Sequence, residues 1–123
     1  MRFEDIRAWQ KAEELTLEVY KNFRGLKDFG FKDQIQRAAV SVMNNIAEGY
    51  ERKSQKSFVH FLLIANGSCA EVRSMLYLAF KLDYLNKDQF DRLLVLAVET
   101  SSLIIGLEKF IRKELKENES IDK

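Results

Sequence analysis

The chain has 123 residues, of which 46% are hydrophobic and 32% are charged, and it contains no proline. This composition excludes a disordered tail, a collagen-like repeat and a disulfide scaffold, and the length is that of one domain. The 20 basic residues against 19 acidic ones give a net charge of +1, which is not the balance of a strongly basic nucleic-acid-binding protein.

Apolar side chains recur at steps of three and four residues in four segments, which predicts four helices. The first two helices are expected at about residues 4–24 and 31–48. Ser54 is a candidate N-cap for a third helix that reaches residue 82. Asn86, followed by Gln89, has the spacing of a capping box at the start of a fourth helix.

Alternation of period two is absent over any useful length, so we predict no strand. Short connections force neighbouring helices to run antiparallel. We therefore predict an all-α, antiparallel, up-down-up-down four-helix bundle in which the last two helices are longer. A single domain should span residues 1–117, with residues 118–123 as a frayed tail.

Two helices carry apolar residues away from their core-facing stripes, and these are Leu63, Ile64, Val95, Val98 and Ile105. Single exposed apolar residues are common on protein surfaces. Two long helices that each carry a second apolar patch are better explained by a subunit interface, so we expect a homo-oligomer.

Four polar residues, Arg37, Ser41, Asn45 and Glu48, share one edge of the second predicted helix because they are spaced by four, four and three residues. Ser68 and Glu71 supply polar groups on the third helix. One interpretation is a polar network that fixes the register of the helices. The other is a contact with a ligand or a nucleic acid through the same groups.

Basic residues gather at the second connection, where Arg52, Lys53 and Lys56 lie close together in the sequence. With Arg37 they form a candidate nucleic-acid-binding surface, and the competing interpretation is that cations are stabilised at a helix C-terminus. A second basic stripe lies near the C-terminus and consists of Lys109, Arg112, Lys113 and Lys116. There we favour the simpler explanation that cations are stabilised at a helix C-terminus.

Catalytic and metal-binding motifs are missing from the chain. A di-metal bundle needs two Glu-x-x-His pairs, and the only histidine, His60, has Ser57 three residues before it. Cys69 falls on the core stripe, where a free cysteine is inert. We predict no enzyme activity, no cofactor and no metal; a small-molecule or metal site around Glu48 and Glu71 is a weaker possibility.

The N-terminal residues carry acidic side chains, and no long apolar run follows them. We therefore expect no signal peptide and no membrane association. The single cysteine gives no indication of an oxidising compartment. These features predict a cytoplasmic protein.

The sequence resembles the four-helix-bundle proteins named for 23S rRNA intervening sequences, over residues 3 to about 115. The matching residues are Trp9-Gln10-Lys11-Ala12, Gln34-Ile35, Arg37-Ala38-Ala39-Val40-Ser41, Asn45-Ile46-Ala47-Glu48-Gly49, Arg52, Ser54, Phe58, Phe61-Leu62, Ile64-Ala65, Gly67-Ser68 and Glu71. The chain departs from the family pattern at Met43, which is often proline, and at Gln36, which is often basic.

The resemblance implies an antiparallel four-helix bundle that assembles as a ring, namely a pentamer. A related branch, the accessory protein of diversity-generating retroelements, is strongly basic and binds nucleic acid and a reverse transcriptase. Because this chain is nearly neutral, that function does not transfer directly. We predict a non-catalytic homo-oligomer that binds structured RNA or DNA as an assembly module; the alternative is a protein-interaction scaffold.

Overall fold

The computed structural model describes residues 1–122, and these residues form one short 3-10 turn and four α-helices. The elements are η1 (Phe3–Asp5), α1 (Arg7–Phe23), α2 (Phe29–Glu51), α3 (Gln55–Lys81) and α4 (Lys87–Asp122). No strand occurs in this part of the chain. The fold is all-α, as predicted.

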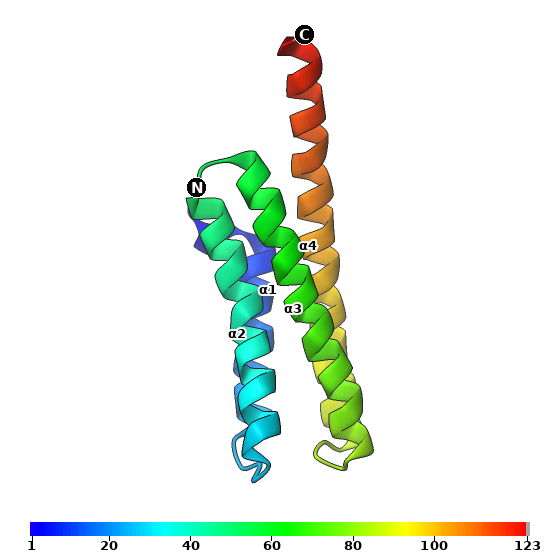
Figure 1. Ribbon diagram of the computed structural model, residues 1–123. Helices are drawn as coiled ribbons and strands as arrows, with labels where there is room; N and C mark the ends of the chain where they lie inside the picture. Colours follow the sequence, from blue (N-terminus) through cyan, green and yellow to red (C-terminus); the bar gives the residue numbers. More distant parts are fainter. Residues whose placement is uncertain (123) are drawn as a thin grey trace.

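Each helix packs against two neighbours: α1 contacts α2 and α4, and α3 contacts α2 and α4. Within the described residues, the backbones of the diagonal pairs, α1 with α3 and α2 with α4, do not approach each other closely. In Figure 1 the α1–α2 and α3–α4 connections lie at one end of the molecule, and the N-terminus and the α2–α3 connection lie near the other. The bundle is therefore antiparallel with up-down-up-down topology.

The helices lengthen along the chain, from 17 residues in α1 to 23, 27 and 36 residues in α2, α3 and α4. At a rise of about 1.5 Å per residue, α4 is about 54 Å long and α1 about 26 Å. The excess length of α4 projects beyond the other helices (Figure 1). Among the described residues, no helix has the length and apolar character needed to cross a membrane.

The end of α4 bears on the predicted tail. Residues 118–122 are helical, and residue 123 lies outside the described residues. Fraying of this segment in solution, and a domain boundary at residue 117, stay predictions.

Side chains at the helix starts explain where the helices begin. Ser54 accepts a hydrogen bond from the backbone N–H of Ser57, and Asn86 and Gln89 each accept one from the other's backbone N–H, at 2.8 and 2.9 Å. The two predicted N-caps are thus confirmed. Asp28 caps α2 by accepting from the N–H of Phe31.

The first helix begins later than predicted. Ile6 is extended, with φ −75° and ψ 122°, so the helix starts at Arg7 and not at residue 4. The preceding residues form the separate turn η1, in which the Asp5 carboxylate accepts from the backbone N–H of Arg2. Ile6 still buries its side chain in the core.

The core is one continuous apolar cluster to which all four helices contribute. Its largest fully buried side chains are Phe23, Leu15, Ile35, Ile46, Leu62, Leu76, Leu93 and Ile104. Buried hydroxyls within it are satisfied locally: Thr16 donates to the carbonyl of Ala12 at 2.8 Å, and Thr100 donates to that of Leu96 at 2.7 Å. This core holds the helix edges that carry the candidate site residues.

Candidate functional site

A small polar network joins α2 and α3. The hydroxyls of Ser41 and Ser68 lie 2.8 Å apart, and the side-chain amide of Asn45 donates to the carbonyl of Ser41 at 2.8 Å and to its hydroxyl at 3.0 Å. These three residues are half-buried at the helix interface. Because each polar group finds a partner across or along the interface, the network favours one register of α2 against α3.

Three residues predicted for this network lie outside it: Glu48, Glu71 and Arg37, which pairs with Asp33. Glu48 forms an ion pair with Arg52 one turn along α2, at 2.8 Å, and its side chain is 53% exposed. Glu71 is exposed on α3 and forms no hydrogen bond to another described side chain. The prediction was wrong for these two carboxylates because α3 and α2 bring only their inner edges together. The described residues include no cluster of potential metal ligands.

Residues 52–56, which link α2 to α3 and include the start of α3, hold three of the four predicted nucleic-acid-binding residues, and we call this segment the α2–α3 connection. The Arg52 guanidinium pairs with Glu48 and lies 5.1 Å from the ring centre of Phe61. Lys53 has a positive φ of 59°, which turns the chain between the helices. Lys53 and Lys56 are exposed, and neither forms an ion pair with another described residue.

Gly49 sets the shape of this connection. A Cβ added at Gly49 would lie 2.7 Å from the Cβ of Phe61 and 3.1 Å from the Cδ1 of Phe58. Only a residue without a side chain allows α2 to end this close to the start of α3. The three basic residues of the connection therefore lie next to a tightly packed contact between the end of α2 and the start of α3.

Arg37, the fourth predicted residue, is not part of this basic cluster. It lies 15 residues before Arg52 on the same helix, a separation of about 22 Å along the axis. Its side chain is 79% exposed and pairs with Asp33 at 2.8 Å. The sequence led us to expect Arg37 beside Lys53 and Lys56. The structure places Arg37 far from both of them.

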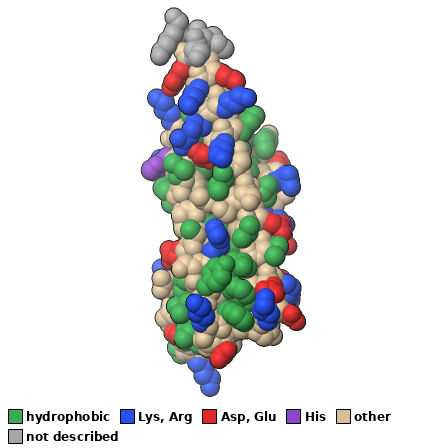
Figure 2. Space-filling model, turned by 90° about the vertical axis from the view of Figure 1, so that its right-hand side faces the viewer, with side chains coloured by type: hydrophobic (Ala, Val, Ile, Leu, Met, Phe, Trp, Pro, Cys, Tyr) green, Lys and Arg blue, Asp and Glu red, His purple; other side chains and the backbone are tan. Residues whose placement is uncertain are grey.

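The residues predicted to form a subunit interface are all exposed. Leu63 and Ile64 on α3 are 50% and 40% exposed, and Val95, Val98 and Ile105 on α4 are 55%, 44% and 37% exposed. Figure 2 shows the side of the molecule on which α4 lies, where hydrophobic side chains interrupt the charged surface and basic ones gather towards the projecting end. We call the five residues the outer apolar face.

Cys69 and His60 show no arrangement for nucleophilic chemistry. Cys69 is buried and donates to the carbonyl of Ala97 at 3.3 Å. Burial raises the pKa of its thiol to about 11, with the nearby Arg73 acting in the opposite direction, so the thiol is protonated at neutral pH. His60 is exposed and packs edge-on against Phe61.

Two polar contacts between helices could not be predicted from the sequence. The hydroxyl of Ser101 donates to the side-chain oxygen of Asn66 at 2.8 Å and joins α4 to α3. Lys11 on α1 pairs with Glu99 on α4 at 3.3 Å. Each partner is an ordinary helix residue whose only indication in the sequence is its type, so the pairing depends on how the helices are rotated.

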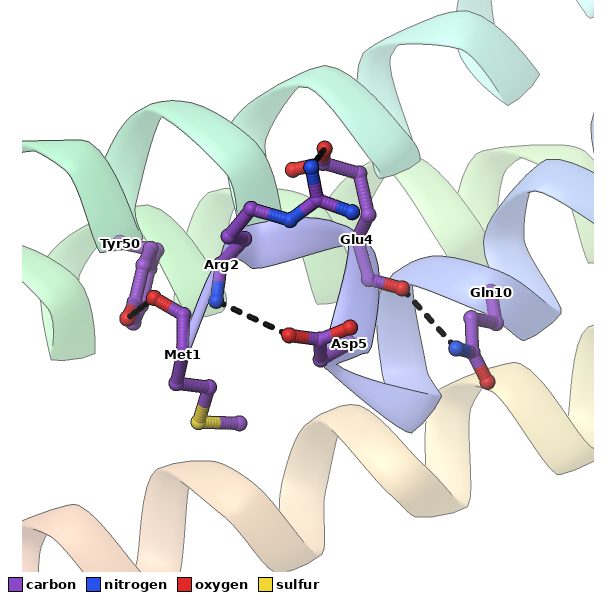
Figure 3. A network of polar contacts seen from close by, with 6 residues as sticks. All are labelled: Met1, Arg2, Glu4, Asp5, Gln10 and Tyr50. Atoms are coloured by element: carbon purple, nitrogen blue, oxygen red, sulfur yellow. Dashed lines mark hydrogen bonds and ion pairs between the residues drawn. The ribbon is translucent and has the colours of Figure 1, made fainter.

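A cavity at the end of the bundle was also not foreseen. It has a volume of about 620 Å³ and lies between the N-terminal residues, the α2–α3 connection and α4. Figure 3 shows the polar contacts that hold its N-terminal wall: the Tyr50 hydroxyl donates to the Met1 carbonyl, and Gln10 donates to that of Glu4. The Met1 side chain points towards α4. This wall exists because the backbone leaves the helical conformation at Ile6. Ile6 still fits the apolar periodicity, so the sequence does not reveal the change.

Comparisons with known proteins agree on the fold. The family model described as "23S rRNA-intervening sequence protein" matches residues 4–106. A crystal structure of a protein with unknown function from the S23 ribosomal protein family of Bacteroides thetaiotaomicron is similar, with a TM-score of 0.78 and 25% sequence identity. The similarity covers 83% of this chain and 98% of that one. No curated protein matches this chain.

Proposed function

Because the chain belongs to the 23S rRNA-intervening sequence protein family, we propose that it is a non-catalytic homo-oligomer that binds structured RNA or DNA through its α2–α3 connection. The observation that carries the proposal is the exposure of Lys53 and Lys56, free of ion pairs with other described residues, beside Arg52. Ammonium groups that no carboxylate neutralises are available to phosphates.

One copy of the connection is too small to bind strongly. Three cations per subunit, one of them already paired with Glu48, give few phosphate contacts. A symmetric assembly multiplies the connection by the number of subunits, and this reconciles nucleic-acid binding with a net charge of +1 per chain. The outer apolar face supports such an assembly, and we expect the pentamer that the family resemblance implies.

The test is a salt titration of binding to an RNA hairpin and a DNA duplex, with Lys53→Glu/Lys56→Glu compared to the wild type. We expect the double variant to lose most of its affinity at low salt. The slope of log K against log salt is negative, and its magnitude should decrease by about two for each engaged subunit, because two phosphate contacts are lost. The matched control is Lys21→Glu/Lys81→Glu, which makes the same charge change on exposed residues elsewhere.

Two outcomes would overturn the proposal: no binding at about 50 mM salt, or tight binding that ignores salt. Equal losses in the two double variants would mean that overall charge, and not the connection, matters. If nucleic acid does not bind while the assembly persists, the protein-interaction scaffold becomes the better interpretation.

A further inference from the structure

At the cavity at the end of the bundle, α4 continues past the level where α1 begins. Lys11 pairs with Glu99, and α1 and α4 run antiparallel, so Arg7, four residues before Lys11, lies at the level of residue 103 of α4. Beyond that level η1 contacts α1 and α2 but not α4. From residue 103 onwards no described helix packs on the side of α4 that faced α1, along about 19 residues or 28 Å, and Leu103 and Leu107 on this side are half-buried.

This side of α4 is apolar at first and acidic farther out. Leu103, Leu107, Phe110, Glu114 and Glu117 recur at steps of four, three, four and three residues, so they share one face of the helix. Leu103, Leu107 and Phe110 line the cavity, and Phe110 is 60% exposed. A large aromatic side chain in this position is a strong candidate for an interface anchor.

The opposite wall of the cavity is apolar and carries a basic residue. Ile6, Ala8 and Phe58 supply apolar surface, and Arg7 is the basic residue among the lining residues of α1. Arg7 is exposed and forms no ion pair with another described residue. Asp5 also lines the cavity, but its carboxylate already accepts from the backbone N–H of Arg2.

The cavity and the projecting end of α4 are thus complementary in apolar surface and in charge, and we infer that the α4 end of a second copy fills the cavity. A two-fold axis near Phe110 lets the two α4 ends cross antiparallel, so that each lies in the cavity of the other copy. In this register residue 103 of one copy faces residue 117 of the other. Arg7, at the level of residue 103, then meets the carboxylate of Glu117 in the second copy, which forms no ion pair with another described residue.

This contact is separate from the outer apolar face. A two-fold contact at the projecting end joins two copies, or two rings, end to end and doubles the number of subunits. Lys53 also lines the cavity, but it is one of the cations proposed to bind nucleic acid. The test therefore uses Phe110, Arg7 and Glu117.

The first experiment measures the molar mass of the full chain by light scattering over a micromolar concentration range. We expect Phe110→Glu to halve the mass found for the wild type, with a dissociation constant raised at least about tenfold. The matched control is Leu17→Glu, which places the same charge on a 65% exposed apolar position of α1 outside the cavity. An unchanged mass for Phe110→Glu, or an equal drop for Leu17→Glu, would overturn the inference.

The second experiment tests the register by exchanging charges. Arg7→Glu and Glu117→Arg should each weaken the doubling, and the two together should restore it, because the pair is re-formed with opposite signs. A double variant no better than the single ones would rule out this register. Since nucleic-acid binding depends on Lys53 and Lys56, half-mass assemblies that still bind RNA would separate the two proposals.

Discussion

At the scale of single residues, Gly49 is the position where one added methyl group should matter most. Its Cβ would lie 2.7 Å from the Cβ of Phe61, an atom fixed by the α3 backbone. Alanine raises helix propensity by about 1 kcal/mol over glycine, but forced overpacking costs about 1–3 kcal/mol. We expect Gly49→Ala to lower the free energy of unfolding by up to about 2 kcal/mol in urea titrations.

Gly30 provides the control for this prediction. It lies in the first turn of α2, and the nearest atom to an added Cβ is the Asp28 Oδ1 at 3.9 Å, an ordinary contact. Gly30→Ala should leave the free energy of unfolding unchanged or raise it by up to about 1 kcal/mol. Equal effects of the two substitutions would show that backbone freedom, and not the approach of α2 to α3, determines the choice of glycine.

The polar residues show how far helical spacing predicts contacts. The spacing placed Ser41, Asn45 and Glu48 on one edge of α2, and the structure joins the first two to Ser68. Glu48 pairs instead within its own helix, because an arginine four residues away is always within reach of its longer side chain. Spacing identifies an edge; it does not determine which partner a flexible side chain selects.

At the scale of elements, the helices and two of their caps were predictable because apolar period and capping chemistry are local. The start of α1 was not, because the extended Ile6 keeps its place in the apolar pattern while the backbone leaves the helix. The stretch of α4 beyond the level of α1 was hidden for a related reason. Its apolar stripe continues through Phe110 and Ile111 whether or not a neighbouring helix is present.

Two elements that are distant in sequence meet at the opposite end of the bundle through Asp28 and Tyr84. The Tyr84 hydroxyl, in the α3–α4 connection, donates to the carboxylate of the α2 N-cap at 2.6 Å. This bond, with that from the Phe31 N–H, lowers the pKa of Asp28 below its ordinary value. We expect Tyr84→Phe to raise the Asp28 pKa, as measured by NMR titration.

The lowered pKa also predicts how stability depends on pH. A carboxylate whose pKa is lower in the folded state stabilises the protein above its unfolded pKa, and this contribution is lost as pH falls through the folded value. The difference in unfolding free energy between wild type and Tyr84→Phe should therefore shrink on acidification through that range. A difference close to zero at every pH would show that Tyr84 acts through its ring contact with Phe31 alone, because phenylalanine keeps the ring and removes only the hydroxyl.

At the scale of the whole molecule, the outer apolar face is the feature that a single copy leaves unexplained. Gly67 on α3 and Gly106 on α4 are exposed, and an added Cβ at either would meet no atom within 4 Å. A mid-helix glycine costs about 1 kcal/mol relative to alanine. No contact inside the described chain offsets that cost, and a close approach by another subunit would do so.

Val98 tests whether this face assembles the protein. Its side chain is 44% exposed, so Val98→Glu should change the unfolding free energy of a single copy by less than about 0.5 kcal/mol. In a buried interface the same carboxylate would be desolvated without a partner, so the assembly should break into smaller species in sedimentation velocity. Phe29→Glu, at a 68% exposed position at the start of α2, is the control and should sediment as wild type. Species of wild-type size for Val98→Glu would exclude this face as an interface, and a halved size for Phe110→Glu alone would leave the α4 end as the contact between copies.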